Sequence, residues 1–473
     1  MSKEYDLVIL GGGTGGYVAA IRASQLGLSA AIVEKGKLGG TCLHKGCIPS
    51  KALLRSAEVF ATAKNAEEFG VIVNDVALDF GKVQERKSSI VNQLHKGVQT
   101  LMKQGEIDVY DGLGRILGPS IFSPTPGTIS VEMNDGTENE MLIPKNVIIA
   151  TGSRPRSLPG LDIDGEKVLS SDEALALTEL PNSLIIVGGG VIGIEWASMM
   201  ADFGVEVTVI EYADRIIPTE DHDISKEMQK LLKKKGITII TSAKVDAASL
   251  VKESNVTITA EVKGEMKAFS ADKILVSVGR QANVEGIGLE NTDIVVEKGF
   301  IHVNELLQTK ESHIYAIGDV IGGLQLAHVA SHEGIQAVEH IANLDVVPID
   351  YTMISKCIYS TPEAASVGLT EQEAKEQGYD VKIGKFPFRA IGKALVFGES
   401  DGFVKMIADK KTNDLLGVHM IGPHVTDMIS EAGLARVLDA TPWEVGQTIH
   451  PHPTLSEAIG EAALAVDGKA IHS

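Results

Sequence analysis

The most constraining feature of the sequence is a strand–glycine–helix–strand unit that occurs twice. Residues 5–34 read as an apolar strand, the run Gly11-Gly12-Gly13-Thr14-Gly15-Gly16, a helix and a second strand. Residues 184–211 repeat this order around Gly188-Gly189-Gly190-Val191-Ile192-Gly193. Each copy fits Gly-x-Gly-x-x-Gly and ends on a glutamate 23 positions after the first glycine. Two copies in this context predict two doubly wound units that bind dinucleotides.

The glycines and glutamates predict how each unit holds its ligand. The first glycine makes the tight turn, the second lets a pyrophosphate approach the backbone, and the third lets the helix pack on the sheet. The helix N-terminus attracts the phosphate charge. A ribose 2′-hydroxyl would donate to Glu34 in one copy and to Glu211 in the other, and a carboxylate there disfavours a 2′-phosphate, so Glu211 favours NAD over NADP. A solvated strand end is the alternative for either glutamate. The glycines concerned are Gly11, Gly13, Gly16, Gly188, Gly190 and Gly193.

Two dinucleotide sites predict two dinucleotides, and FAD with NAD is the natural pair. The net charge of −20 disfavours nucleic acid, whose phosphates would be repelled, and leaves room for a basic protein partner. No run of about 18 apolar residues predicts a membrane span, and no signal peptide precedes the first strand. Three cysteines in 473 residues suit a reducing cytoplasm, where a close pair is more often catalytic or metal-binding than structural.

Cys42 and Cys47 form such a pair. In a regular α-helix their Cα atoms would lie ~7.5 Å apart along the axis, and a disulfide spans at most ~6.8 Å. We therefore expect a distorted or tightened helical turn, which Gly46 and Pro49 permit. A thiol pair beside a dinucleotide site suggests electrons moving through a disulfide. A metal site is the alternative, but no second pair exists to complete a tetrahedral zinc site. Cys357 is expected to be a small buried hydrophobe.

Further motifs follow in a fixed order along the chain, and together with the glycine units they carry a resemblance. They are Gly39-Gly40-Thr41-Cys42, Cys47-Ile48-Pro49-Ser50-Lys51, Ala150-Thr151-Gly152-Ser153, Tyr315-Ala316-Ile317-Gly318-Asp319 and His450-Pro451-His452-Pro453-Thr454-Leu455-Ser456-Glu457. Over essentially its whole length the chain resembles the pyridine nucleotide–disulfide oxidoreductases, and among them the members that oxidise dihydrolipoamide.

The resemblance implies an α/β fold with two Rossmann-like dinucleotide-binding domains and a C-terminal α+β dimerisation domain. It assigns residues 1–150 to FAD binding, 151–279 to NAD binding, 280–345 to a central domain that completes the FAD site, and 346–473 to the homodimer interface. It implies oxidation of protein-bound dihydrolipoamide, with electrons passing through the disulfide and FAD to NAD⁺. The implied partners are the lipoyl domain and the acyltransferase core of a 2-oxo acid dehydrogenase complex.

The resemblance also implies roles for the reacting side chains. Cys42 exchanges with the lipoyl sulfur, and Cys47 faces the flavin. Thiol–disulfide exchange needs a base because the thiolate is the nucleophile, and His452 matches that base. Glu457 orients it, and the pair comes from the partner subunit. His450 is expected to be a structural or surface histidine.

Cofactor contacts follow from the same motifs. Lys51 is implied near the flavin ring and pairs with Glu195, while Asp319 binds the ribityl chain with help from Ala327. The remaining implied contacts lie in or beside the conserved-looking glycine segments. They are Gly40, Thr41, Gly114, Thr151, Gly152, Ser153 and Gly279.

Some residues and alternatives stand outside this pattern. His44 and Lys45 replace the Asn-Val of most relatives, in a variant that looks like enzymes of branched-chain 2-oxo acid dehydrogenase complexes. A glutathione-type or mercuric reductase is the alternative within the family, although Glu211 counts against NADP-linked reductases. A non-catalytic flavoprotein redox sensor is the alternative from another class. His328 and His332 have the spacing of a helical metal site, but packing histidines are expected because no acidic or cysteine ligand accompanies them.

Overall fold

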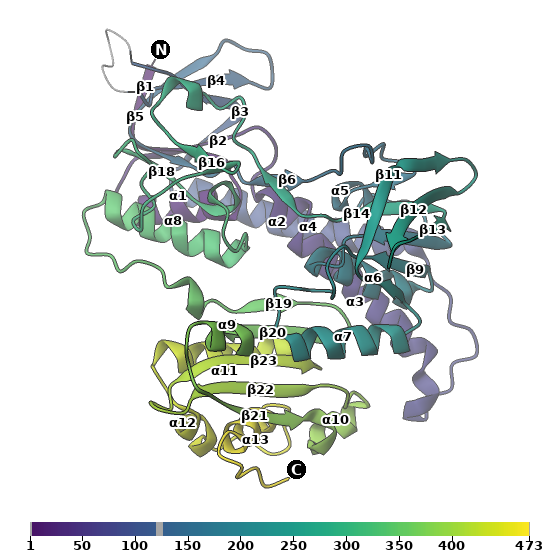
Figure 1. The fold of residues 1–473 in the computed structure, drawn as a ribbon. Helices are drawn as coiled ribbons and strands as arrows, with labels where there is room; N and C mark the ends of the chain where they lie inside the picture. The colour runs from purple at the N-terminus through teal and green to yellow at the C-terminus, as the bar shows by residue number, and fades with distance from the viewer. Residues whose placement is uncertain (1, 120–125, 473) are drawn as a thin grey trace. The chain divides into compact units, whose positions relative to one another are not determined.

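The computed structural model describes residues 2–119 and 126–472. The chain divides into two compact units, each assembled from three stretches that are distant in sequence (Figure 1). Unit 1 takes the described residues of Met1–Ala52, Gly81–Arg156 and Arg280–Ile349. Unit 2 takes those of Leu53–Phe80, Ser157–Gly279 and Asp350–Ser473.

Unit 1 is built around a mostly parallel sheet. Strand β1 pairs in parallel with both β2 and β5, β3 joins beyond β2, and β18 joins beyond β5. Strand β4 runs antiparallel to β3 and β5. The elements are β1 (Ser2–Leu10), α1 (Thr14–Gln25), β2 (Ala30–Glu34), α2 (Gly40–His44), β3 (Asp108–Ile116), β4 (Ile129–Met133), β5 (Glu140–Ile149), β6 (Ser153–Pro155), β15 (Arg280–Ala282), η2 (Leu289–Asn291), β16 (Val296–Glu297), β17 (Phe300–Ile301), β18 (Ile314–Ala316), η3 (Gly318–Ile321) and α8 (Ala327–Ile341). Two helices belong to both units by residue number, α3 (Cys47–Lys64) and α4 (Phe80–Gln104).

Both faces of this sheet are covered. In β1, Leu7 and Ile9 belong to one buried apolar cluster, while Val8 and Leu10 belong to another. Burial on both faces explains why the strand reads as a continuous apolar run instead of alternating with polar residues. Helices α1 and α8 pack closely, since a Cβ on Gly334 would lie 2.8 Å from the Gly15 carbonyl oxygen.

Unit 2 contains a second parallel sheet, in the order β10-β9-β8-β14-β7, and an antiparallel meander of β11, β12 and β13. The unit β8–α6–β9 is the second copy of the repeated sequence motif. The elements of this part are η1 (Ala66–Phe69), β7 (Val168–Leu169), α5 (Ser171–Ala174), β8 (Ser183–Val187), α6 (Val191–Phe203), β9 (Glu206–Ile210), α7 (His222–Lys234), β10 (Thr238–Ile240), β11 (Ala243–Lys252), β12 (Val256–Val262), β13 (Glu265–Ala271) and β14 (Lys273–Val276).

The last part of unit 2 is an antiparallel sheet, in the order β19-β20-β23-β22-β21, with helices packed on it (Figure 1). Strands β22 and β23 are buried along their whole length, and residues of α11 and α13 complete the apolar core beside them. The elements are η4 (Tyr351–Met353), β19 (Lys356–Ile358), β20 (Glu363–Gly368), α9 (Glu371–Glu376), β21 (Val381–Pro387), η5 (Phe388–Ala390), α10 (Gly392–Phe397), β22 (Phe403–Asp409), β23 (Leu415–Gly422), α11 (Val425–Val437), α12 (Pro442–Gln447) and α13 (Glu457–Ala465).

The predicted fold class is confirmed: two parallel nucleotide-binding sheets are accompanied by a C-terminal α+β sheet. Residues 280–349 return to unit 1, where β18 pairs with β5. The division into four domains at 150, 279 and 345 stays a prediction. Among the described residues, no helix combines the length and apolar content needed to cross a bilayer.

Candidate active site

The first glycine turn, between β1 and α1, is packed too tightly for side chains at two of its three glycines. Gly11 has a φ of 108°, and a Cβ on it would lie 2.2 Å from the Ala150 carbonyl oxygen. A Cβ on Gly16 would lie 1.9 Å from the Gly11 oxygen. Gly13 differs, because its nearest neighbour would be the Cα of Gly40 at 3.8 Å. The fold itself therefore requires the first and third glycines and leaves room above the second.

The second turn, between β8 and α6, repeats this arrangement. A Cβ on Gly188 would lie 2.4 Å from the Ser277 oxygen, and one on Gly193 would lie 2.0 Å from the Gly188 oxygen. No described atom lies within 4 Å of the corresponding point on Gly190. In both copies the space above the second glycine lies at a helix N-terminus, which is where a pyrophosphate binds. The residues present therefore fit a dinucleotide in each turn.

The two glutamates predicted to contact ribose are fixed in the same way. Glu34 Oε2 accepts a hydrogen bond from the backbone N–H of Gly12 at 2.7 Å, and Glu211 Oε2 accepts one from Gly189 at 2.5 Å. The other oxygen of each accepts from the backbone N–H two residues further along, at 2.7 and 2.6 Å. Both carboxylates are thus held on their glycine turns, unlike freely solvated strand ends.

The cysteine segment is a broken helix, as the spacing predicts. Helix α2 ends at His44, and α3 begins at Cys47 after a turn at Lys45 and Gly46. Cys42 is the third residue of α2, and Cys47 is the first residue of the 18-residue helix α3. The N–H groups and dipole at that helix start favour a thiolate on Cys47.

The two thiols lie in contact with each other, and Cys42, Cys47 and Cys357 form no disulfide in this structure. The hydrogen bond with Cys47 and burial raise the pKa of Cys42 well above its usual range, against smaller opposing effects of Thr14 and Lys51. Repulsion between two thiolates side by side adds to these effects. Ionisation of both thiols of a reduced pair at the same time is therefore disfavoured.

Beyond β5, three polar side chains of unit 1 form a small network. The Arg280 guanidinium donates from Nε to Ser153 Oγ at 2.6 Å and from Nη2 to the Ser153 carbonyl at 2.9 Å. The Ser153 hydroxyl donates to Asp319, which also lies 3.5 Å from Arg280 Nε. Thr151 donates to the Asn283 carbonyl at 2.7 Å. Ser153 and Asp319 were predicted site residues, and the structure brings them together.

Sequence reasoning missed two residues at this site. Arg280 directly follows Gly279 and is the first residue of β15; its position beside that glycine was the only signal in the sequence. Glu333 lies in α8, is 2% exposed, and accepts a hydrogen bond from the backbone N–H of Gly318 at 2.6 Å. Its acidic side chain on an otherwise apolar helix face could have been noticed, because buried carboxylates require partners.

Two predicted glycines have structural reasons of their own. A Cβ on Gly40 would lie 2.5 Å from the Cα of Gly13, so the segment before Cys42 lies directly against the first glycine turn. A Cβ on Gly114, in β3, would lie 2.6 Å from Leu10 Cδ2. Packing against backbone requires Gly40, while a side chain at Gly114 would have to displace the end of the Leu10 side chain. Contact of either glycine with a cofactor stays a prediction.

The other predicted contacts are distributed over both units. Thr41 is half-buried in α2, Gly152 and Gly279 have positive φ with no described atom near their would-be Cβ, and Ala327 is the first residue of α8. Lys51 is half-buried in α3 of unit 1.

Glu195 belongs to unit 2. It is 6% exposed in α6 and accepts a hydrogen bond from the backbone N–H of Tyr359 at 3.0 Å. The predicted pairing of Lys51 with Glu195 stays a prediction.

His452 and Glu457 are paired in unit 2. His452 Nδ1 lies 2.8 Å from Glu457 Oε1, and the Thr454 N–H donates to the other oxygen at 2.9 Å. Although burial opposes it, these hydrogen bonds hold the pKa of Glu457 below its usual value. The His452 side chain is 77% exposed, so its Nε2 edge is open to a partner or substrate. His450 instead contacts Glu431 at 2.7 Å, in a structural setting as expected.

The remaining candidate residues have ordinary settings. His328 and His332 are exposed on α8, and His332 contacts the His328 carbonyl at 2.9 Å. No group of three potential metal ligands occurs in the part of the chain that the structure describes. Cys357 packs against the C-terminal core, and burial raises the pKa of its thiol to about 11.

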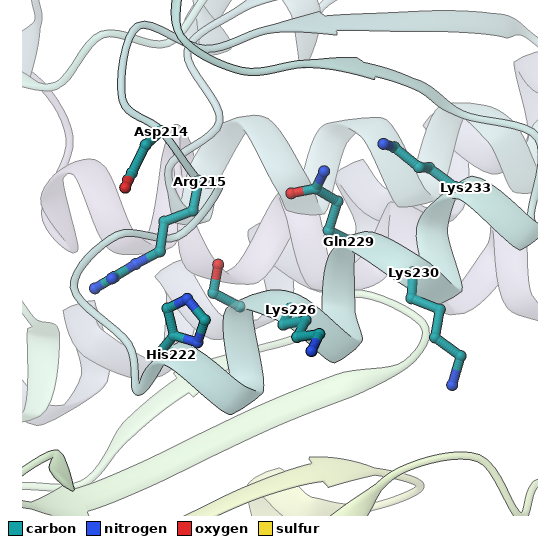
Figure 2. A pocket seen from close by; sticks show the side chains of 8 residues that line it. Asp214, Arg215, His222, Lys226, Gln229, Lys230 and Lys233 are labelled. Atoms are coloured by element: carbon teal, nitrogen blue, oxygen red, sulfur yellow. The ribbon is translucent and has the colours of Figure 1, made fainter.

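A hollow of about 490 Å³ lies over α7 in unit 2 (Figure 2). Figure 2 shows Asp214 and Arg215 on a loop and the other labelled side chains on the helix. Arg215 is turned to the Pro218 carbonyl, to which Nη2 donates at 2.7 Å. None of the residues predicted for the site lines this hollow. Its lining residues are Asp214, Arg215, His222, Ser225, Lys226, Gln229, Lys230 and Lys233.

Comparison with known proteins agrees with this geometry. Residues 5–334 match the family described as pyridine nucleotide-disulphide oxidoreductase, and residues 354–463 match its dimerisation domain. The chain is 75% identical to "Dihydrolipoyl dehydrogenase" of Bacillus subtilis, over all of both chains. It is 44% identical to the protein of the same name from Zymomonas mobilis, again over all of both chains.

A solved structure is similar over nearly the same length. The crystal structure of LpdA from Mycobacterium tuberculosis superposes with a TM-score of 0.89 at 26% identity, covering 97% of this chain and 98% of that one. The resemblance predicted from the ordered motifs is confirmed. The chain belongs to the pyridine nucleotide-disulphide oxidoreductase family.

Proposed function

We propose that this chain oxidises protein-bound dihydrolipoamide to lipoamide and reduces NAD⁺ to NADH, as an FAD-dependent enzyme. The observation that carries the proposal is the contact between Cys42 and Cys47 at the start of α3, on a segment packed against the first glycine turn. The full-length identity of 75% to a protein named dihydrolipoyl dehydrogenase supports the same substrate.

The exchange chemistry follows from the two cysteines. In the oxidised enzyme a dihydrolipoyl thiolate attacks Cys42, the Cys42–Cys47 bond breaks, and its electron pair goes to the Cys47 sulfur. The second lipoyl thiolate then displaces Cys42 from the mixed disulfide and closes the lipoyl disulfide. The pair is left reduced by two electrons, with one proton retained on Cys42.

The glycine turns supply the cofactor sites. The first turn with Glu34 would hold FAD, and the second turn with Glu211 would hold NAD. The network of Ser153, Arg280 and Asp319 lies beyond the end of β5, where a polar chain of FAD can be bound. Bound FAD would supply two-electron transfer between the reduced cysteine pair and NAD⁺.

His452 supplies the proton transfer. Lipoyl thiols are mostly protonated at neutral pH, so a base must remove each proton before the sulfur can attack. The carboxylate of Glu457 orients the His452 ring and stabilises its protonated form. We assign this pair to the active site of the partner subunit in a homodimer, since His452 is exposed on its own chain.

The dimerisation-domain match over residues 354–463 supports the homodimer. We further propose that the partners are the lipoyl domain and the acyltransferase core of a 2-oxo acid dehydrogenase complex, and that the enzyme acts in the cytoplasm. A branched-chain complex is the specific assignment suggested by His44 and Lys45.

The proposal is tested with the purified holoenzyme. We expect a yellow protein that reduces NAD⁺ with dihydrolipoamide and uses NADP⁺ poorly. Oxidised glutathione with NADPH and mercuric ion with NADPH serve as comparison reactions. A faster rate in either comparison reaction, or a yellow protein inactive with dihydrolipoamide, would contradict the proposal.

A further inference from the structure

Helix α2, which carries Cys42, is too short to hold its own shape. It spans five residues, and its backbone makes a long bond from the Leu43 N–H to the Gly39 carbonyl at 3.4 Å and a better one from Lys45 to Thr41 at 2.8 Å. Isolated helices shorter than about 12 residues are marginal in water. The position of the Cys42 thiol therefore depends on contacts from outside the helix.

Two histidines supply such contacts at a single atom. His44 Nε2, at the last residue of α2, lies 2.9 Å from the Leu38 carbonyl oxygen, and His95 Nδ1, from α4, lies 2.9 Å from the same oxygen. The two rings meet edge to face, with centroids 5.1 Å apart. The His44 contact joins the last residue of α2 to Leu38, which lies just before the start of that helix. The His95 contact attaches the same residue, Leu38, to α4, a helix of 25 residues.

Leu38 is also fixed from its other side. It is 7% exposed, and the Gly39 N–H after it donates to the Gly12 carbonyl at 2.8 Å. A Cβ on Gly12 would lie 2.6 Å from Leu38 Cδ2. Leu38 thus connects the first glycine turn with the two histidines.

We propose that His44 and His95 are positioning residues that hold α2 through the Leu38 carbonyl and so set the place of the Cys42 thiol during disulfide exchange. This inference rests on the proposed function. It gives a structural role to His44, one of the two residues that depart from the family pattern.

The shared acceptor also fixes the protons. A carbonyl only accepts, so the His44 proton is on Nε2 and the His95 proton on Nδ1. Burial lowers the pKa of His44, and the nearby His95 and Lys37 lower it further, against the Leu38 hydrogen bond and Glu34. On balance these effects favour the uncharged form of the His44 ring.

The test uses four variants of the holoenzyme. H44A and H95A each remove one donor, while H44Q keeps a donor near the Nε2 position and H95N keeps one near Nδ1. H302A, which replaces an exposed histidine of unit 1, is the matched control. The readouts are kcat and KM with dihydrolipoamide, and the rate at which iodoacetamide alkylates Cys42 in the reduced enzyme, located by peptide mass mapping.

We expect H44A and H95A to lower kcat about tenfold with a smaller change in KM, because a misplaced Cys42 sulfur disturbs the geometry in which the lipoyl thiolate attacks it. We expect Cys42 to be alkylated about tenfold faster in these variants, since looser packing exposes the thiol. Slow alkylation of Cys357 in the same variants would show that the protein remains folded. In the variants H44Q and H95N, kcat and the rate of Cys42 alkylation should both lie close to the wild-type values.

Unchanged kcat and unchanged Cys42 alkylation in both alanine variants would overturn the proposal. Equal losses in the alanine variants and in H44Q and H95N would overturn it too, since the N–H donor would then not matter. Alkylation needs no turnover, so it tests the histidines even if the wild-type enzyme does not oxidise dihydrolipoamide.

Discussion

The Glu211 carboxylate accepts a hydrogen bond from the backbone N–H of Gly189 at 2.5 Å. Glu34 accepts the same bond from Gly12 at 2.7 Å. In both turns the glutamate side chain therefore bonds the residue between the first and second glycines of the motif. A carboxylate held in this way is oriented before a ligand arrives, which is what the proposed contact with a ribose hydroxyl requires.

Replacing Glu211 should weaken the preference for NADH over NADPH. In E211A the acceptor for the ribose hydroxyl and the negative charge that repels a 2′-phosphate are both lost. We expect the ratio of kcat/KM for the two coenzymes to fall by about tenfold or more, as for the loss of a charged hydrogen bond. Steady-state kinetics measures this ratio. E206A, at the exposed start of β9, the strand that ends just before Glu211, is the control; an unchanged ratio in E211A would refute the ribose assignment.

Substitutions can distinguish the role of the second glycine from that of the third in the turn between β8 and α6. Gly190 has extended backbone with φ of −73°, and no described atom lies within 4 Å of its would-be Cβ. We expect G190A to fold and keep FAD, while the KM for NAD⁺ rises about tenfold because the methyl group takes the phosphate space. G193A should instead reduce the folded yield, since its Cβ would lie 2.0 Å from the Gly188 oxygen. A normal KM in G190A would contradict the assignment.

The relay through the cysteines predicts a complete loss of turnover when its inner member is removed. In C47S no disulfide can form with Cys42, and electrons from dihydrolipoamide have no route inward. We expect no measurable lipoamide activity with FAD still bound, seen as an unchanged yellow absorbance. C357A is the control, because burial and a pKa of about 11 keep that thiol out of exchange. Full activity in C47S would refute the relay.

The His452–Glu457 pair has a matched counterpart a few residues away. His472 Nδ1 lies 2.7 Å from Glu461 Oε1, compared with 2.8 Å between His452 Nδ1 and Glu457 Oε1. We expect E457Q to lower kcat about 100-fold, the lower end of what general base catalysis contributes. E461Q should stay near wild type. Equal rates for the two variants would show that Glu457 does not act through His452.

Local patterns predicted much of this site. The repeated spacing placed Glu34 and Glu211 on their glycine turns, and the geometry of a helix required the break between Cys42 and Cys47. Each of these inferences uses residues close together in sequence. The requirement for the third glycine, for example, follows from contacts within one short motif, because a Cβ on Gly16 or Gly193 would meet the oxygen of Gly11 or Gly188.

Long-range contacts were the part that the sequence did not reveal. Arg280 meets Ser153 only because β15 pairs with β6. His95 meets His44 only because α4 packs beside α2. A single sequence contains no signal for which of 13 histidines will share an acceptor, and tertiary packing decides it.

A buried ion cluster in unit 2 is a further feature that only the structure shows. Lys405, in β22, has a side chain 2% exposed and lies 2.9 Å from Asp221, 3.1 Å from Asp223 and 2.8 Å from Glu371. The cluster joins α7 and its preceding loop to the C-terminal sheet. Although burial opposes both shifts, the mutual hydrogen bonds raise the pKa of Lys405 and contribute to the lowered pKa of Asp221.

Replacing Lys405 should therefore destabilise unit 2 in a pH-dependent way. In K405M the buried Asp221 and the half-buried Asp223 and Glu371 lose their cation. Removal of one partner of a buried pair, such as Lys405 with Asp221, costs about 3–5 kcal/mol. The native carboxylates have lowered pKa values, so their stabilisation is present above the unfolded pKa near 4 and is lost as pH falls below it. The difference between wild type and K405M in urea midpoint should be large at pH 7 and shrink toward pH 3. K410M removes an exposed pair with Asp380 and should change the midpoint little; equal effects of the two substitutions would contradict the role of burial.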